Sequence, residues 1–313
     1  MDNFSNTAKL KVVGVGGAGG NAINDMIESN ITSVDFIAIN TDQQDLDRSQ
    51  APVKVLLGRG MGAGADPEKG RIAAKESEEK IKEVLEGTDM LFITAGMGGG
   101  TGTGASPIIA EVAKAMGILT VAIVTKPFSF EGPLKKNNAA TGINNLRENV
   151  DTLIAIPNDR LFEIPGMNIS LMNAFKEANG VLKMGIKGIS DLITKQGIVN
   201  LDFADVKSIM QNSGIAMLGF GEANGDEKAK SATAQALNSP LLEKSIEGAR
   251  KILINITGGP DVSLNEVNEV ANTVTAKAGS EPNLIWGYIL DEELEGTISV
   301  SIVATDFQDN LHS

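Results

Sequence analysis

The chain has 313 residues, of which 42% are hydrophobic and 21% charged, so a globular protein of about two domains with a sizeable core is expected. Its net charge of −13 disfavours binding to a nucleic-acid backbone, and the absence of cysteine excludes disulfides, thiolate catalysis and cysteine-bound zinc. Because the only histidine is His312, histidine-based triads and metal sites are excluded, and a metal would be a hard, oxygen-bound ion such as Mg²⁺.

The first half of the chain alternates short apolar runs with helical patterns. The predicted strands are residues 10–15, 34–39, 90–94, 118–125 and 152–156, and the predicted helices are 20–29, 67–85, 107–116 and 135–149. Asp66 and Ser106, each followed by proline, are typical of helix starts, whereas Gly87 and Gly117 are expected to follow helix ends. Continuous apolar runs separated by helices indicate a parallel sheet that is covered on both faces.

A long helical pattern follows at residues 170–194, which we interpret as a connecting helix between two domains. Apolar residues three or four positions apart predict one buried stripe along it, formed by Leu171, Phe175, Ala178, Leu182, Ile186, Ile189 and Ile193. Further helices are predicted at 203–210, 227–237 and 263–277, and strands at 216–220, 251–256, 284–289 and 297–304. The predicted α/β fold thus has a first domain at 1–169, a connecting helix and loop at 170–199, a smaller α/β domain at 200–307 and a frayed tail at 308–313.

The first candidate site is a G-x-G-x-x-G motif formed by Gly14, Gly16 and Gly19 directly after the first predicted strand. Backbone N–H groups and the dipole of the following helix could hold a phosphate there. The motif by itself also fits a tight turn without a ligand. Asp42, near the end of the second strand, keeps a dinucleotide-binding interpretation open, because such folds bind a ribose with an acid at that place.

A second glycine-rich run occupies residues 96–104, again between a predicted strand and a helix. Because the carboxyl ends of parallel strands meet at one edge, we expect both glycine loops to face the same phosphates. A flexible linker would be oddly sited at this position. A third cluster at 60–64 could close over a terminal phosphate or be an ordinary mobile loop. Neither of the two phosphate loops ends in Gly-Lys-Ser/Thr, which disfavours a Walker-type NTPase.

At these residues the sequence resembles the FtsZ family of bacterial cell-division proteins, which are tubulin-like GTPases. The signature Gly-Gly-Gly-Thr-Gly-Thr-Gly stands at residues 98–104, and further matching segments are 40–42, 127–132, 156–160, 200–206, 239–242 and 255–260. The resemblance covers roughly residues 9–306. It implies a tubulin-like parallel-sheet GTPase domain, a long central helix and a smaller α/β C-terminal domain, in agreement with the predicted organisation.

The resemblance implies a site for GTP or GDP that is built mainly from the glycine loops. It places Glu131 and Lys135 at the ribose, and Phe175 and Asn179 at the guanine. The other nucleotide-binding residues that it implies are Gly16, Gly17, Ala18, Gly19, Gly20, Asn21, Gly62, Ala63, Gly64, Gly96, Met97, Gly98, Gly99, Gly100, Thr101, Gly102, Thr103, Gly104, Pro127 and Asn158.

Three departures from the family pattern affect this site. Lys135 stands where the family usually has arginine, so a planar bidentate grip is exchanged for a point charge. Gly180 stands where an aspartate commonly reads guanine, so base selectivity would depend on Asn179, Asn21 or the backbone. The loop before Gly60 is shorter than usual. We expect these changes to adjust affinity and rate.

Asn200, Asp202 and Asp205 are the candidate catalytic residues, at the start of a predicted helix. Their spacing places the two carboxylates on one side of the helix, although an aspartate at a helix start is commonly only a cap. Phosphoryl transfer needs an in-line water and compensation of phosphate charge. The resemblance implies that these residues of one subunit complete the nucleotide site of the next, and it implies no dedicated protein ligands for a metal.

The sequence therefore predicts a GTPase that assembles head to tail into filaments of the division ring, using Mg²⁺ and, as a further ion, K⁺. We expect it in the cytoplasm at the division site, because no signal peptide and no apolar run of the ~18 to 20 residues that span a bilayer is seen. Nucleic-acid binding and membrane insertion are not expected. Division-machinery proteins and membrane tethers are expected as partners, although the family's usual C-terminal peptide is not seen in this sequence.

Two alternatives from other classes stay open at this point. An NAD-dependent oxidoreductase would use the first glycine motif together with Asp42. A nucleotide-holding scaffold would bind GTP without hydrolysing it. Competition between nucleotides tests the first alternative, and phosphate release tests the second.

Overall fold

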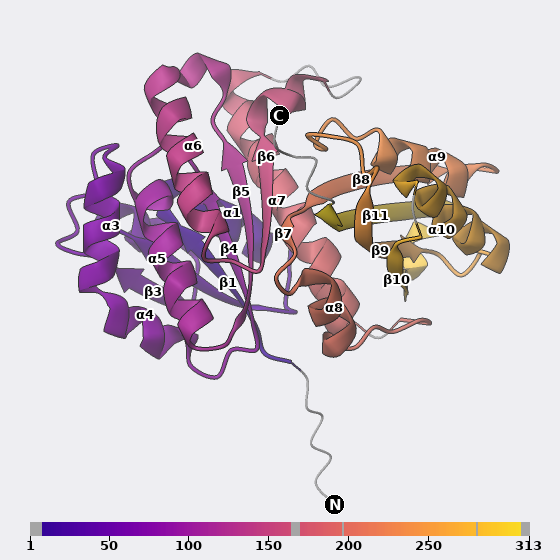
Figure 1. The fold of residues 1–313 in the computed structure, drawn as a ribbon, viewed down its shortest axis with the longest axis horizontal. Helices are drawn as coiled ribbons and strands as arrows, with labels where there is room; N and C mark the ends of the chain where they lie inside the picture. Colours follow the sequence, from indigo (N-terminus) through magenta and orange to yellow (C-terminus); the bar gives the residue numbers. More distant parts are fainter. Residues whose placement is uncertain (1–7, 164–169, 196, 280, 308–313) are drawn as a thin grey trace, which may run out of the picture.

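The computed structural model describes residues 8–163, 170–195, 197–279 and 281–307, which form two sheets with a long helix between them (Figure 1). The larger sheet is entirely parallel, with seven strands in the order β3-β2-β1-β4-β5-β6-β7. This order, apart from the added β7, is that of a doubly wound sheet, which binds ligands at its carboxyl edge. The strands are β1 (Leu10–Val15), β2 (Asp35–Asn40), β3 (Val53–Leu56), β4 (Met90–Gly96), β5 (Leu119–Lys126), β6 (Thr152–Pro157) and β7 (Gly214–Ile215).

Helices cover both faces of the larger sheet. One face packs against α1 (Gly16–Glu28) and α7 (Leu171–Thr194). The opposite face is covered by α3 (Pro67–Glu76), α4 (Glu78–Leu85), α5 (Thr101–Ala115) and α6 (Pro133–Arg147) (Figure 1). The connections include α2 (Gln43–Arg48), η1 (Ser129–Glu131) and η2 (Asn158–Glu163). Burial of the central strands on both faces explains why they are continuous apolar runs in the sequence.

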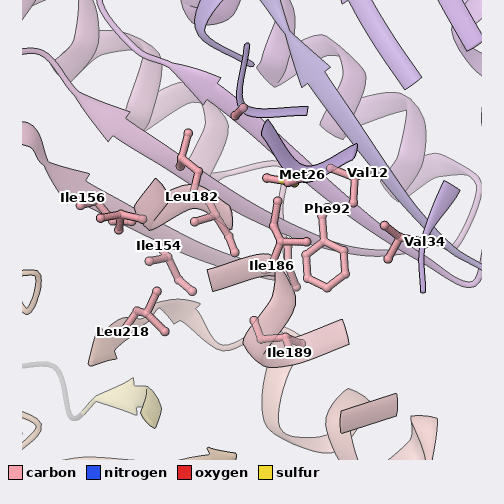
Figure 2. Close-up of a cluster of buried hydrophobic side chains, with 14 of the residues drawn as sticks. Val12, Met26, Val34, Phe92, Ile154, Ile156, Leu182, Ile186, Ile189 and Leu218 are labelled. Atoms are coloured by element: carbon pink, nitrogen blue, oxygen red, sulfur yellow. The ribbon is translucent and has the colours of Figure 1, made fainter. Parts of the chain in front are cut away.

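The long helix α7 packs between the larger sheet and the C-terminal part of the chain. Its start is capped by Ser170, whose hydroxyl accepts a hydrogen bond of 3.3 Å from the N–H of Asn173. Ala178, Leu182, Ile186 and Ile189 are buried as predicted, and Ile193 is half-buried. Figure 2 shows Ile186 next to Phe92 of β4, in a cluster that also holds Ile154 of β6 and Leu218 of the C-terminal part.

The predicted stripe on α7 is wrong at Phe175, which is 47% exposed. Its ring instead meets that of Phe128 edge to face, with 5.4 Å between the ring centroids. The side chain of Leu171 lies outside the described part of the structure. Among the described residues of the predicted stripe, burial begins at Ala178.

The C-terminal part is a four-stranded mixed sheet in the order β10-β9-β11-β8, in which only β10 and β9 are parallel. One face packs against α9 and α10, and the other contributes to the same hydrophobic cluster as α7. The elements are α8 (Phe203–Met210), β8 (Met217–Asn224), α9 (Lys228–Leu237), β9 (Ala249–Gly258), α10 (Leu264–Ala278), β10 (Asn283–Leu290), η3 (Glu292–Leu294) and β11 (Thr297–Phe307).

Three predicted helices differ from those in the structure. The first begins at Gly16 rather than at residue 20, and the predicted helix 67–85 is two helices with Ser77 between them. The prediction of a helix start at Ser106-Pro107 is wrong, because α5 begins at Thr101 and carries Pro107 in its interior. Asp66 caps α3 as predicted, because its side chain accepts a hydrogen bond of 3.0 Å from the N–H of Glu68.

Several short elements were not predicted, namely α2, β3 and β7. Strand β7 follows α8 yet pairs with β6, so residues beyond 200 contribute to the larger sheet. The domain boundaries stay predictions, and the proposed tail lies outside the described residues. Among the helices that the structure describes, none is long and apolar enough to cross a membrane.

Candidate functional site

A cleft of about 380 Å³ lies at the carboxyl edge of the larger sheet. It is bordered by segments that follow β1, β2, β4, β5 and β6 and by the first turns of α7. Of the predicted nucleotide-binding residues, the cleft is lined by Gly16, Gly17, Ala18, Gly62, Ala63, Gly64, Gly96, Met97, Gly99, Gly100, Thr101, Gly102, Pro127, Glu131, Lys135, Asn158, Phe175 and Asn179. The tertiary structure thus brings together residues that are up to 163 positions apart in the sequence.

The remaining predicted residues do not line the cleft. Gly20 and Asn21 line a smaller neighbouring cavity of about 170 Å³, which shares Gly16 and Gly17 with the cleft. Thr103 and Gly104 face a groove on the opposite side of α5. Gly19, within α1, and Gly98, in the second loop, do not line the cleft.

The first glycine loop places the start of α1 at the cleft. Gly16 has a φ of +72°, which favours glycine, and α1 begins at this residue. No side chain caps α1, and its first turn holds no acidic residue. The first N–H groups of the helix are therefore available to an anion, which the helix dipole would also stabilise.

The second glycine loop repeats this arrangement at α5. This helix likewise has neither a side-chain cap nor an acidic residue in its first turn. Gly98 has a φ of +113°, and its N–H donates to Oγ1 of Thr103 over 2.7 Å. Gly98 and Thr103 therefore fix the shape of the loop, while Gly99, Gly100 and Thr101 face the cleft. Two helix starts on adjacent strands thus point at one cleft, which suits a chain of phosphates.

The third glycine cluster closes the same end of the cleft. It follows β3, and its Gly62 N–H donates to the carbonyl of Thr41 over 2.9 Å. The hydroxyl groups of Thr41 and Thr101 lie 2.6 Å apart and join this region to the second loop. Thr41 was not singled out from the sequence, because only the fold places it beside α5.

Asp42 borders the cleft, but it has a structural role as well. Its Oδ1 accepts a hydrogen bond of 2.9 Å from the N–H of Gln44 and thereby caps α2. Asp45 also lines this end of the cleft. The structure thus places two carboxylates beside the predicted phosphate loops, and the described residues contain no cluster of three or more metal-binding side chains.

Charged and aromatic side chains line the other end of the cleft. The carboxylate of Glu131 accepts from Nζ of Lys135 over 2.8 Å and from the N–H of Phe128 over 2.9 Å. Glu131 is therefore held in place without a ligand. The ring of Phe175 packs on the buried Phe128, and Asn179 lies one turn later on α7. An exposed ring beside an amide can contact both the face and the polar edge of a base.

Asn158 gives a direct sign that the cleft takes a polar ligand. This residue is only 4% exposed, yet its Oδ1 has no hydrogen-bond partner. A buried acceptor without a partner is unfavourable by about 1–3 kcal/mol. A donor on a bound ligand, such as a ribose hydroxyl or a base N–H, would satisfy it, so the residues present fit a nucleotide.

The turn that carries Glu131 is tied to η2 through Asp159. Its carboxylate accepts from both the N–H and the hydroxyl of Ser129. Burial would raise the pKa of Asp159, but the hydrogen bonds from Ser129 and the charge of Lys136 outweigh it and hold the pKa below its usual value. The ionised carboxylate therefore stabilises the edge of the cleft.

The candidate catalytic residues lie apart from the cleft. Asp202 and Asp205 begin α8 and form a reciprocal capping box there. Oδ1 of Asn200 accepts a hydrogen bond of 2.5 Å from the N–H of Gly197. None of the three lines the cleft, which meets α7 at its N-terminal end, whereas these residues follow its C-terminal end.

This fold and cleft define an α/β protein of the nucleotide-binding class, with two glycine loops at helix starts beside one cleft. A model of the Tubulin/FtsZ family GTPase domain matches residues 9–166, and a model of the FtsZ family C-terminal domain matches residues 214–308. The chain therefore belongs to the FtsZ family and is a tubulin-like cytoskeletal GTPase.

Solved structures agree with this assignment. An FtsZ dimer from M. jannaschii is 48% identical with a TM-score of 0.91, and the match covers 95% of this chain and 88% of that one. A CetZ2 protofilament with bound GTPγS from Haloferax volcanii is 22% identical with a TM-score of 0.81, covering 96% of this chain and 94% of that one. The second likeness supports the fold alone.

Proposed function

We propose that this GTPase assembles head to tail into filaments, and that the acids of one subunit complete the GTP site of the next. The supporting observation is that the two parts of the site lie at opposite ends of α7. Phe175 and Asn179 at its start line the cleft, whereas Asp202 and Asp205 follow its end. The helix has 24 residues and thus spans about 36 Å. One chain cannot bring both parts to the same phosphate, but a repeated head-to-tail contact can.

Within the cleft, the two helix starts hold the phosphates and the opposite end holds the nucleoside. Backbone N–H groups at Gly99, Gly100 and Thr101 donate to phosphate oxygens. Glu131, with Lys135 beside it, accepts from ribose hydroxyl groups. Phe175 packs against the base, and Asn179 pairs with its polar edge. Each assignment uses a side chain or N–H group that lines the cleft.

The acids at α8 supply what the cleft lacks. Asp202 and Asp205 of one subunit orient a water molecule in line with the last phosphorus–oxygen bond of the neighbour's GTP, and Asn200 helps to hold that water. In the single subunit Asp205 is half-buried and Asp202 is exposed. Hydrolysis in this arrangement requires contact between subunits, so it rises with assembly.

A magnesium ion fits the phosphate end of the cleft. Asp42 and Asp45 line that end and would provide hard oxygen ligands. When bound, the ion offsets the charge of the phosphate oxygens. Cytoplasmic location, a place in the division ring and contacts with division-machinery proteins and membrane tethers are proposed from family membership, as is the use of K⁺.

Assembly and turnover measured together test this proposal. Light scattering is followed after addition of GTP and Mg²⁺, with GDP as the control, while phosphate release is measured over a range of protein concentrations. We expect scattering only with GTP, and a turnover per subunit that rises steeply with concentration. Turnover that is independent of concentration would contradict the shared site, and GTP binding without phosphate release would support a scaffold instead.

A further inference from the structure

The segment that precedes the candidate catalytic acids pairs with the edge of the C-terminal sheet. Strand β10 is the outermost strand of that sheet, with β9 on its other side. The N–H of Ile198 donates to the carbonyl of Tyr288 over 3.1 Å, and the N–H of Tyr288 donates to the carbonyl of Val199 over 3.1 Å. Residues 198 and 199 are therefore held on this edge by an isolated antiparallel bridge.

This pairing is close enough to require glycine at position 197. A Cβ atom on Gly197 would lie 2.1 Å from the carbonyl oxygen of Tyr288, which real side chains do not tolerate. The N–H of Gly197 is also the donor to Oδ1 of Asn200. One residue thus allows the backbone contact and closes the loop on which a candidate catalytic side chain stands.

Tyr288, whose backbone makes this contact, is itself held firmly in place. The residue is 5% exposed, and its hydroxyl lies 3.1 Å and 2.6 Å from the carbonyl oxygens of Gly258 and Gly259, between which its one proton is shared. Burial, with Asp261 and Glu266 nearby, raises the pKa of Tyr288. The hydroxyl therefore keeps its proton, and its role as a donor, at neutral pH.

Apolar side chains pack next to this contact. Val199 and Trp286 each pack against the hydrophobic core of the C-terminal domain. The position of Gly287 is equally tight, since a Cβ there would lie 2.7 Å from Leu192 and 3.4 Å from Leu201. The capping box at Asp202 begins three residues after Val199. The pairing with β10 thus fixes the segment that leads into the acids, while the buried face of α8 anchors the helix that follows.

We propose that Gly197 is a positioning residue for GTP hydrolysis, with the backbone of Tyr288 as the template that holds the acid-bearing loop. This inference rests on the proposed function of Asp202 and Asp205. It adds that the loop is positioned by the C-terminal sheet and not only by its own helix. A displacement of about 1 Å at a catalytic group can lower a rate about 10²-fold, so a shifted loop should affect turnover far more than binding.

The test compares Gly197→Ala with Gly188→Ala. Gly188 also lies near the domain contact, but a Cβ there would make ordinary contacts of 3.4 Å and 3.5 Å with Ser301. For Gly197→Ala we expect an unchanged Kd for GTP and a kcat at least 10-fold lower. We also expect a changed emission of Trp286, the only tryptophan of the chain. Gly188→Ala should match the parent in all three. A parent-like kcat for folded Gly197→Ala would overturn the proposal.

Tyr288→Phe provides a second variant in case Gly197→Ala does not fold. It keeps the buried ring but removes the donor to Gly258 and Gly259, so the template loosens without a steric clash. We expect a kcat lowered several-fold with the same Kd for GTP. A parent-like kcat for Tyr288→Phe together with an unfolded Gly197→Ala would assign both residues a purely structural role and overturn the proposal.

Mixing experiments separate this inference from the proposed function. Gly197→Ala keeps its cleft, so it should regain turnover with a variant whose cleft is blocked, such as Gly99→Val, but not with Asp205→Asn, whose acids are also impaired. If Asp205→Asn hydrolyses GTP normally, the proposed function fails. If Asp205→Asn is inactive while Gly197→Ala has the rate of the parent, only the positioning role fails.

Discussion

Asp202 and Asp205 cap each other at the start of α8. Oδ1 of Asp202 accepts from the N–H of Asp205 over 2.8 Å, and Oδ2 of Asp205 accepts from the N–H of Asp202 over 3.2 Å. Such a reciprocal box stabilises a helix start. One oxygen of each carboxylate is thereby engaged, and the other is left for chemistry. A test of catalysis at this site must preserve the cap.

The first prediction concerns Asp205→Asn, which keeps an acceptor for the N–H of Asp202 but removes the charge. We expect the variant to fold and to bind GTP like the parent. Its hydrolysis should be at least ~10²-fold slower, the scale of losing a group that orients water or accepts a proton. Thermal unfolding, GTP titration and phosphate release provide the measurements. Parent-like hydrolysis would leave Asp205 with the capping role alone.

Because the site is shared between subunits, the GTP turnover lost in Asp205→Asn should return in part when this variant is mixed with Gly99→Val. In contacts with Gly99→Val, the intact cleft of the first variant meets the intact Asp205 of the second. Two inactive proteins should therefore regain part of the turnover, limited because a subunit without nucleotide ends a filament. If co-assembly is shown by sedimentation and turnover stays absent, the acids do not act across the contact.

The second prediction concerns the phosphate end of the cleft. Gly99 lines it, has an ordinary backbone conformation, and would bring a Cβ within 4 Å of no other atom. Gly99→Val should therefore fold normally while its side chain fills the phosphate position. We expect a Kd for GTP raised at least ~10-fold and an unchanged melting temperature without nucleotide.

Gly102→Val is the informative contrast to Gly99→Val. A Cβ at Gly102 would lie 2.7 Å from the carbonyl oxygen of Gly96, so this substitution disturbs the loop itself. We expect it to lower the melting temperature as well as the affinity. Tight GTP binding by folded Gly99→Val would contradict the assignment of this loop to the phosphates.

The third prediction concerns base selectivity at the start of α7. A Cβ at Gly180 would meet no other atom within 4 Å, so Gly180→Asp adds a carboxylate next to Asn179 without a clash. That carboxylate can accept from the two N–H donors of the guanine edge, which adenine lacks. We expect Gly180→Asp to increase the preference for GTP over ATP and Asn179→Ala to reduce it, as measured by competition binding. An unchanged preference in both would assign base reading to Asn21 or the backbone.

The fourth prediction follows from the lowered pKa of Asp159. A carboxylate whose folded pKa lies below the unfolded value, about 3.8, stabilises the fold fully above that pH. The contribution is lost as the pH falls below 3.8 through the folded pKa. Asp159→Asn should therefore melt at a lower temperature than the parent at pH 7. The difference should shrink at pH values under about 3.8, and a difference that is constant with pH would contradict this role.

Much of the fold could be predicted because its signals are local. Strands β1, β4 and β5 are buried on both faces, so their apolar runs are continuous. The two glycine loops and the helices at Ser170 and Asp66 are likewise marked by short motifs. The sequence motifs by themselves were also enough to indicate the family, and hence the nucleotide.

Other features could not be predicted because long-range contacts decide them. A helix start at Ser106-Pro107 is the ordinary local expectation, but α5 extends back to Thr101, where its glycines pack tightly: a Cβ at Gly104 would lie 1.9 Å from the carbonyl of Pro67. Strand β3 is a half-exposed strand at the edge of the sheet, and its four residues are too few for an apolar pattern to be recognised in the sequence. Phe175 fits an apolar stripe, yet only the cleft beside it explains its exposure.

The sequence by itself determined which residues could bind phosphate and which could act as acids, because those properties belong to residue types and their spacing. The tertiary structure alone decided which side chains line the cleft and that residues 198 and 199 pair with β10. Contacts of this kind join residues such as Gly197 and Tyr288, which lie 91 positions apart. No local pattern encodes such a separation, because it depends on how the two sheets and α7 pack together.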